Sequence, residues 1–187
     1  MLNNQINKEF YSSYLYLHFS TFYAVQGLNG FSNWYQIQAM EERDYAMLML
    51  KYLQNNGVHV TLEAIDKSKA DLKENIGPLL AGFEHERYVT SLIYTIYEMA
   101  CEDKDYRMMQ FWDWFVKEQG EEESTADELV KKMQMFGSDS KGLYMLDQEL
   151  ETTLGGIFEV IEKRIELIRV ARMVLENTMV QERNSKS

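Results

Sequence analysis

Four long stretches with a helical repeat of apolar residues, joined by a short, a long and a short connection, limit this chain to few folds. The stretches run from about Leu2 to Gln26, Phe31 to Gln54, Pro78 to Glu102 and Tyr106 to Phe136. Residues 27–30 and 104–105 form short turns, whereas Val58–Gly77 is long and precedes the single proline, Pro78. This order of connections predicts an all-α four-helix bundle with one long crossover.

A further apolar stripe follows the four stretches. Its residues are Ile157, Ile161, Ile165, Ile168, Leu175 and Met179. We therefore expect two parts, a four-helix bundle over residues 1–140 and a C-terminal helical extension over residues 141–187, with an extended fifth helix.

Composition and charge exclude several classes of function. The chain has 30 Asp and Glu against 19 Lys and Arg, a formal net charge of −11, which argues against nucleic-acid binding and favours cations as partners. Cys101 is the only cysteine, so one chain cannot form a disulfide framework or a thiolate metal cluster. We see no basic-plus-apolar leader and no apolar run of about 18 residues, and therefore expect a cytoplasmic protein with no membrane partner.

Each of the four predicted helices carries an acid within its apolar face. The first places Glu9 and Tyr16 among Ile6, Phe10 and Leu17; the second places Glu42 and Tyr45 among Tyr35, Ala39, Ala46 and Met49. The third places Glu86 between Phe83 and Val89; the fourth places Gln119 and Glu122 in a stripe that includes Met108, Phe115, Leu129, Met133 and Phe136. We expect these four acids to point into the bundle.

Buried acids of this kind require compensation. An ionised carboxylate in an apolar core costs several kcal/mol, and facing carboxylates repel one another. A divalent cation relieves both effects, and oxygen ligands suit iron, although manganese or zinc would also satisfy them. Any single acid of the four is equally consistent with a position at the edge of its stripe that reaches water.

Other residues near these acids carry weaker signals. Glu41 can flank Glu42, and Glu118 and Glu121 can flank Glu122, but acids 121–123 taken alone indicate a solvated helix face. Tyr16 taken alone is a core aromatic residue whose hydroxyl needs an acceptor, and its place two turns after Glu9 favours a bond to a ligand. His18, His59 and His85 lie off the stripes, and we expect them to be structural or exposed.

Residues 1–150 resemble the non-haem bacterial ferritins. The resemblance rests on Lys8-Glu9-Phe10-Tyr11-Ser12-Ser13, Met40-Glu41-Glu42, Glu84-His85-Glu86, Lys117-Glu118-Gln119-Gly120-Glu121-Glu122-Glu123 and Gly142-Leu143-Tyr144. It implies an iron storage protein, a ferroxidase that oxidises Fe(II) with dioxygen at a di-iron carboxylate site and stores Fe(III) mineral in a homo-oligomeric cage of twenty-four subunits. In such a site Glu9 holds one iron, Glu42 is shared, Glu86 and Glu122 hold the second, and Gln119 lies alongside.

The same resemblance implies a third, weaker metal site near Glu41, Glu118 and Glu121, and a functional tyrosine matching Tyr16. It implies no haem, because Arg43 stands where bacterioferritins place a haem-ligating methionine. Gln119 and Glu122 also replace the glutamate-histidine pair that bacterioferritins and rubrerythrin-like proteins carry on this helix.

Two features depart from the family pattern. The family places a histidine three residues after the shared glutamate, whereas this sequence has Tyr45, so the first iron loses its nitrogen donor. Tyr45 can bind ferric iron as phenolate, hydrogen-bond Glu9 or fill the space, and a neutral phenol is a poor ligand for Fe(II). The alternative function is therefore a ferritin-like iron-binding or assembly protein with weak or no ferroxidase activity.

The second departure is the long C-terminal extension, which puts the usual contacts of the cage in question.

Overall fold

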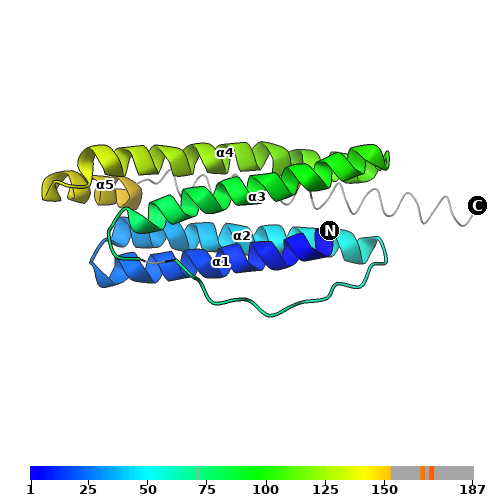
Figure 1. Cartoon of the computed structure of the whole chain (residues 1–187), viewed down its shortest axis with the longest axis horizontal. Coiled ribbons are helices and arrows are strands. Elements are labelled where there is room, and N and C mark those ends of the chain that lie inside the picture. Colours follow the sequence, from blue (N-terminus) through cyan, green and yellow to red (C-terminus); the bar gives the residue numbers. More distant parts are fainter. Residues whose placement is uncertain (71, 153–164, 167–168, 171–187) are drawn as a thin grey trace, which may run out of the picture.

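The computed structural model describes residues 1–70, 72–152, 165–166 and 169–170. Five helices form this part of the chain: α1 (Leu2–Val25), α2 (Asn29–Asn55), α3 (Gly77–Glu102), α4 (Tyr106–Phe136) and α5 (Ser140–Thr152). The four longer helices run along the long axis of the molecule (Figure 1). Within the described residues no helix is both long enough and apolar enough to cross a membrane.

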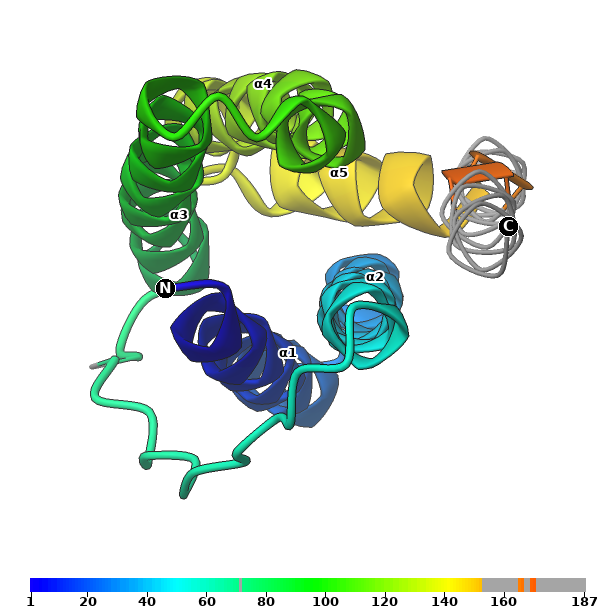
Figure 2. The ribbon, with the colours of Figure 1, turned by 90° about the vertical axis from the view of Figure 1, so that its right-hand side faces the viewer.

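The helices pack as two pairs that face each other. α1 lies against α2, α3 lies against α4, and α1 also contacts α3. The view along the bundle shows the four helices around a common centre, with the crossover passing outside α1 (Figure 2). The predicted all-α bundle with one long crossover is confirmed, because residues 58–70 and 72–76 hold no helix and every predicted end of the four helices lies within two residues of the observed one.

Local sequence explains where these helices begin and end. Gly27 and Gly57 have φ angles of +78° and +72°, a left-handed conformation that glycine adopts without strain after a helix end. Pro78 lies in the first turn of α3, where its missing N–H costs no helical hydrogen bond. Asp105 caps α4, because its Oδ1 accepts a 3.0 Å hydrogen bond from the backbone N–H of Met108.

Two apolar clusters form the core. One contains Ile6, Met49, Ile93 and Phe115, and the other contains Phe19, Tyr35, Leu129 and Met133. Three residues of the predicted stripes lie outside the core: the side chains of Leu17, Phe136 and Ile165 are 46%, 50% and 45% exposed. Phe136 is the last residue of α4 and extends past the bundle, and Leu17 lines a groove beside the crossover rather than the core.

α5 closes one end of the bundle by packing on α2 and α4. Asp147 of α5 is 5% exposed, and its Oδ1 accepts a 3.1 Å hydrogen bond from the backbone N–H of Phe31. This contact supplies an acceptor at the start of α2, where Leu28 provides no side-chain cap. Of the predicted 141–187 extension, α5 forms the first part, Val170 packs into the cluster with Ile6, and residues 153–164, 167–168 and 171–187 lie outside the described residues.

Gly30 makes this close packing of α5 possible. A Cβ atom at position 30 would lie 1.9 Å from the backbone oxygen of Asp147, too close for two packed backbones. We expect Gly30→Ala to displace α5 and to lower the free energy of unfolding by roughly 1–3 kcal/mol, as overpacking does. Thermal unfolding followed by circular dichroism measures the loss.

Gly120→Ala is the matched control for this substitution. Gly120 also lies within a helix, and a Cβ atom there meets nothing within 4 Å. Alanine should stabilise α4 at that position by about 1 kcal/mol. Equal effects of the two substitutions would contradict the role given to Gly30.

Candidate metal centre

Four glutamates from four helices meet inside the bundle. Glu9, Glu42, Glu86 and Glu122 come from α1, α2, α3 and α4, and their side chains are 1%, 4%, 3% and 6% exposed. Burial raises the pKa of Glu42 most, and the charges of Glu9, Glu86 and Glu122 raise it further, so the four carboxyl groups share one environment. We call this group of side chains the inner pocket.

The half of the inner pocket between α1 and α2 is short of hydrogen-bond donors. Gln5 Nε2 donates to Glu9 Oε1 at 2.7 Å, but Glu9 Oε2 and Glu42 Oε2 are buried and receive no hydrogen bond from the described residues. Burial raises the pKa of both carboxyl groups, and the charge of Glu9 raises that of Glu42 further. When Glu42 is protonated, its hydroxyl can donate a hydrogen bond to Glu9. When both carboxyl groups are ionised, their negative charges repel each other without compensation.

The half between α3 and α4 has more donors. The Tyr16 hydroxyl donates to Glu86 Oε1, and Gln119 Nε2 donates to Glu86 Oε2 at 2.6 Å. Burial and the charge of Glu122 raise the pKa of Glu86 to about 8, although these two hydrogen bonds act in the opposite direction. Burial also raises the pKa of Tyr16 well above 10, so its hydroxyl stays protonated and acts as a donor.

Two of the three predicted flanking acids are buried beside the inner pocket, and the third is not. Glu41 and Glu118 are 4% and 6% exposed, and Gln38 Nε2 donates to Glu41 Oε2 at 2.5 Å. Glu121 is exposed and forms a 3.4 Å ion pair with Lys117 one turn earlier. The structure therefore brings Glu41 and Glu118, but not Glu121, to this region.

Tyr45 extends from α2 toward α4. Its hydroxyl donates to Glu118 Oε1 at 3.2 Å and to Glu122 Oε1 at 3.3 Å, not to Glu9. The ring lies edge-on to Trp114, with 5.4 Å between the ring centres. Burial, followed by the charges of Glu122 and Glu118, raises its pKa well above 10. Tyr45 is thus a neutral donor that links an inner-pocket carboxylate to a flanking one.

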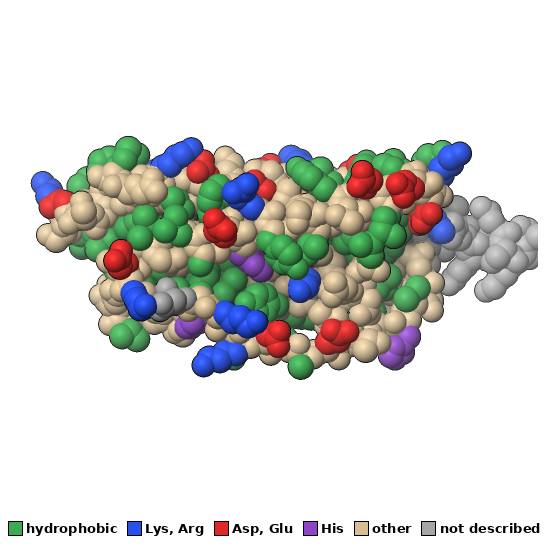
Figure 3. All heavy atoms as spheres, viewed as in Figure 1, with side chains coloured by type: hydrophobic (Ala, Val, Ile, Leu, Met, Phe, Trp, Pro, Cys, Tyr) green, Lys and Arg blue, Asp and Glu red, His purple; other side chains and the backbone are tan. Residues whose placement is uncertain are grey.

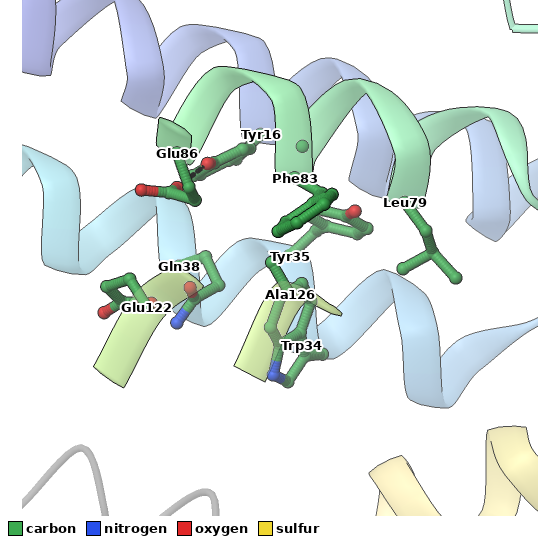
Figure 4. A pocket seen from close by; sticks show the side chains of 10 residues that line it. Tyr16, Trp34, Tyr35, Gln38, Leu79, Phe83, Glu86, Glu122 and Ala126 are labelled. Atoms are coloured by element: carbon green, nitrogen blue, oxygen red, sulfur yellow. Dashed lines mark hydrogen bonds between the residues drawn. The ribbon is translucent and has the colours of Figure 1, made fainter. Parts of the chain in front are cut away.

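A small cavity adjoins the inner pocket. Tyr16, Gln38, Glu86 and Glu122 lie at one end of it, and aromatic and aliphatic side chains, Leu79 at the far end, line the rest (Figure 4). Its volume of about 10 Å³ is close to the least that one water molecule needs.

Sequence reasoning missed the amides that support the carboxylates. Gln5 and Gln38 are 2% and 8% exposed, and each donates to a glutamate of its own helix. Their spacing was the available signal, because Gln5 lies four residues before Glu9 and Gln38 three before Glu41. His85 has the expected structural role: its Nε2 lies 2.7 Å from Ser12 Oγ, and burial lowers its pKa to about 4.

The oxygen donors of the inner pocket suit a hard cation. Among the residues that the structure describes, no three Asp, Glu, His or Cys side chains already stand in the geometry of a metal site. The carboxylates instead face the donors Gln5, Tyr16 and Gln119. Binding a cation here would exchange part of these hydrogen bonds for coordination bonds.

The comparison with known families decides what kind of protein carries this pocket. The ferritin-like domain model matches residues 1–136, which include all four inner-pocket glutamates. The chain belongs to the ferritin family. It is 34% identical over 150 residues to a probable bacterial non-heme ferritin-like protein of Haemophilus influenzae, covering 80% of this chain and 91% of the relative.

Other ferritins match over a similar length. The chain is 34% identical over 151 residues to a bacterial non-heme ferritin of Campylobacter jejuni, covering 81% of this chain and 90% of that one. The open pore ferritin of Archaeoglobus fulgidus superposes with a TM-score of 0.78 and 38% identity, over 81% of this chain and 92% of that structure. These matches confirm the resemblance that the motifs indicated.

The raised pKa of Glu42 gives a prediction about stability. Below its usual pKa of 4.5, Glu42 is protonated in the folded and unfolded chains alike; above it, only the fold retains the proton. Glu42 therefore weakens the metal-free fold progressively as the pH rises from 4.5 toward its raised pKa. Glu42→Gln removes this dependence on a retained proton and gives Glu9 an amide donor at every pH, so the metal-free variant should unfold several degrees above wild type at pH 8, with a smaller difference at pH 5.

With Co(II) present, wild type should unfold at a higher temperature than Glu42→Gln, because wild type gains a bound cation and the variant lacks one of its ligands. Differential scanning calorimetry at both pH values, with and without Co(II), measures these shifts. Glu84→Gln is the control, since Glu84 is an exposed acid on α3. A Glu42→Gln variant that is less stable than wild type at pH 8 without metal would show that the buried charges are not in conflict.

Proposed function

We propose that this ferritin stores iron by oxidising Fe(II) with dioxygen at the inner pocket and holding the Fe(III) product in a homo-oligomeric cage. One observation carries the proposal: four carboxyl groups from four helices are buried together, and two of their oxygens receive no hydrogen bond from the described residues. Membership of the ferritin family supports a role in iron storage.

The charges of the pocket favour the oxidised ion. Fe(III) carries one more positive charge than Fe(II), so a group of carboxylates stabilises it more strongly and lowers the reduction potential of the bound iron. Each of two Fe(II) ions would give one electron to dioxygen, which takes up two protons from water and leaves as hydrogen peroxide. Protons that Glu42 and Glu86 hold while the pocket is empty leave when the cation binds, so binding should weaken as the pH falls below about 8.

The surrounding side chains have supporting roles in this scheme. Tyr16 and Gln119 orient Glu86, and Gln5 orients Glu9. The glutamates act as ligands, and no general base is needed. The adjoining cavity of about 10 Å³ is too small for an organic substrate.

The combined substitution Glu42→Ala and Glu86→Ala tests the ferroxidase assignment. Loss of two ligands should slow aerobic Fe(II) oxidation by roughly tenfold or more. The increase of the near-ultraviolet absorbance of Fe(III) after Fe(II) addition gives the rate. The control is Glu84→Ala with Glu98→Ala, two exposed acids of the same helix, α3. Equal rates in wild type and in the Glu42 and Glu86 variant would exclude the inner pocket as the oxidation site.

A surface feature supports the cage. Tyr14 and Leu17 of α1 are 52% and 46% exposed, and the crossover presents Leu62 and Ile65 at 62% and 48%. Hydrophobic side chains lie between charged ones on the face that includes α1, α3 and the crossover (Figure 3). Tyr14 and Leu17 also line a groove of about 310 Å³. Apolar groups grouped in this way are typical of a surface that another subunit covers.

We expect static light scattering to give a mass of about 530 kDa, twenty-four times the chain mass of 22.1 kDa. Leu17→Glu should lower this mass, because a charge then replaces an apolar contact at the covered surface. Lys117→Glu, which changes an exposed residue of α4, serves as the control. A monomeric wild type would contradict the cage.

A further inference from the structure

The two halves of the inner pocket offer different ligands to a cation. The half between α1 and α2 contains Glu9 and Glu42, and its two uncompensated oxygens belong to these residues. Glu42 also interacts with Glu86 and Glu122, so the other half can draw on three carboxylates, with the Gln119 amide beside them.

The residue at position 45 decides whether the half between α1 and α2 gains another ligand for a cation. Residue 45 lies one turn after Glu42, so a side chain there projects from the same face of α2. The Tyr45 hydroxyl instead contacts Glu118 and Glu122 on α4, at 3.2 and 3.3 Å. Trp114 and Phe115 pack against its ring and hold it in this direction.

The hydroxyl is also unsuited to replace a nitrogen ligand. It is buried among acids and donates its proton to them, and the oxygen of a neutral phenol is a weaker ligand for Fe(II) than an imidazole nitrogen. By donating to Glu118 and Glu122 on the α4 side, Tyr45 adds no ligand to the half between α1 and α2, where Glu9 and Glu42 are the two inner-pocket acids.

We propose that Tyr45 makes the inner pocket bind two divalent cations unequally, one tightly between Glu42, Glu86 and Glu122, and a second much more weakly between Glu9 and Glu42. This inference rests on the proposed function and specifies its order of events. The tight position fills first, and Fe(II) concentration then controls the second position. Because each Fe(II) gives one electron, oxidation by pairs of iron ions depends on filling the weak position.

Anaerobic equilibrium dialysis with Co(II) tests the proposal without oxidation. The Glu42→Ala and Glu86→Ala variant is measured in parallel, and the ions that it binds are subtracted as sites outside the pocket. Wild type should bind one pocket ion per chain tightly and a second at least roughly tenfold more weakly. Tyr45→His should tighten the second ion by at least roughly tenfold, and the visible absorbance of the bound Co(II) should change as nitrogen replaces oxygen.

Tyr45→Phe is the matched variant, since it keeps the ring against Trp114 and removes only the hydroxyl. It should leave the second ion as weak as in wild type, because it restores no ligand. A second ion that tightens equally in Tyr45→Phe would mean that the hydroxyl blocks the position, and it would overturn the proposal.

The remaining outcomes separate the inference from the function on which it rests. Two equally tight pocket ions in wild type would overturn the inference and leave the iron-binding pocket intact. Equal Co(II) binding by wild type and by the Glu42 and Glu86 variant would overturn both. The wild-type titration decides the first question alone, so the proposal stays testable even if Tyr45→His fails to fold.

Discussion

The structure depends on the burial of four carboxyl groups at one level of the bundle. Each comes from a different helix, and removing any helix would expose the pocket to water. Burial disfavours their charged forms and proximity makes them repel, so the empty pocket retains protons that an exposed glutamate would release. A cation that displaces these protons relieves both costs. The same burial and repulsion would therefore favour the binding of a cation that we propose for this pocket.

The rest of the bundle supports this polar layer. One apolar cluster includes Tyr45 and Phe115, and the other includes Tyr16 and Leu129. The two tyrosines thus belong both to the core and to the pocket, because their rings pack with apolar neighbours while their hydroxyls donate to carboxylates. This packing fixes the direction of the hydroxyls. The direction of the Tyr45 hydroxyl is the observation from which we infer unequal binding of two cations.

Helical periodicity predicted most of the fold and the buried set of acids. Gly57 and Pro78 marked helix boundaries because glycine and proline restrict the backbone locally. Periodicity failed where contacts across the fold decide exposure. Leu17 fits the apolar stripe of α1 but is 46% exposed. Among the acids that the family resemblance places near a third metal site, Glu121 faces solvent with Lys117. Neighbouring residues on a helix differ by about 100° in direction, so small rotations of the helix decide such cases.

The sequence by itself determined the helices, the crossover and the identity of the four inward acids, since these follow from local spacing and the cost of burying charge. Only the tertiary structure decided the partners. It directs Tyr45 to Glu118 and Glu122 instead of Glu9, places Gln5 and Gln38 beside buried carboxylates, and brings Asp147 to the start of α2, 116 residues away. Hydrogen bonds between helices depend on rotation and distance at the level of about one ångström, and the period of apolar residues does not carry that information.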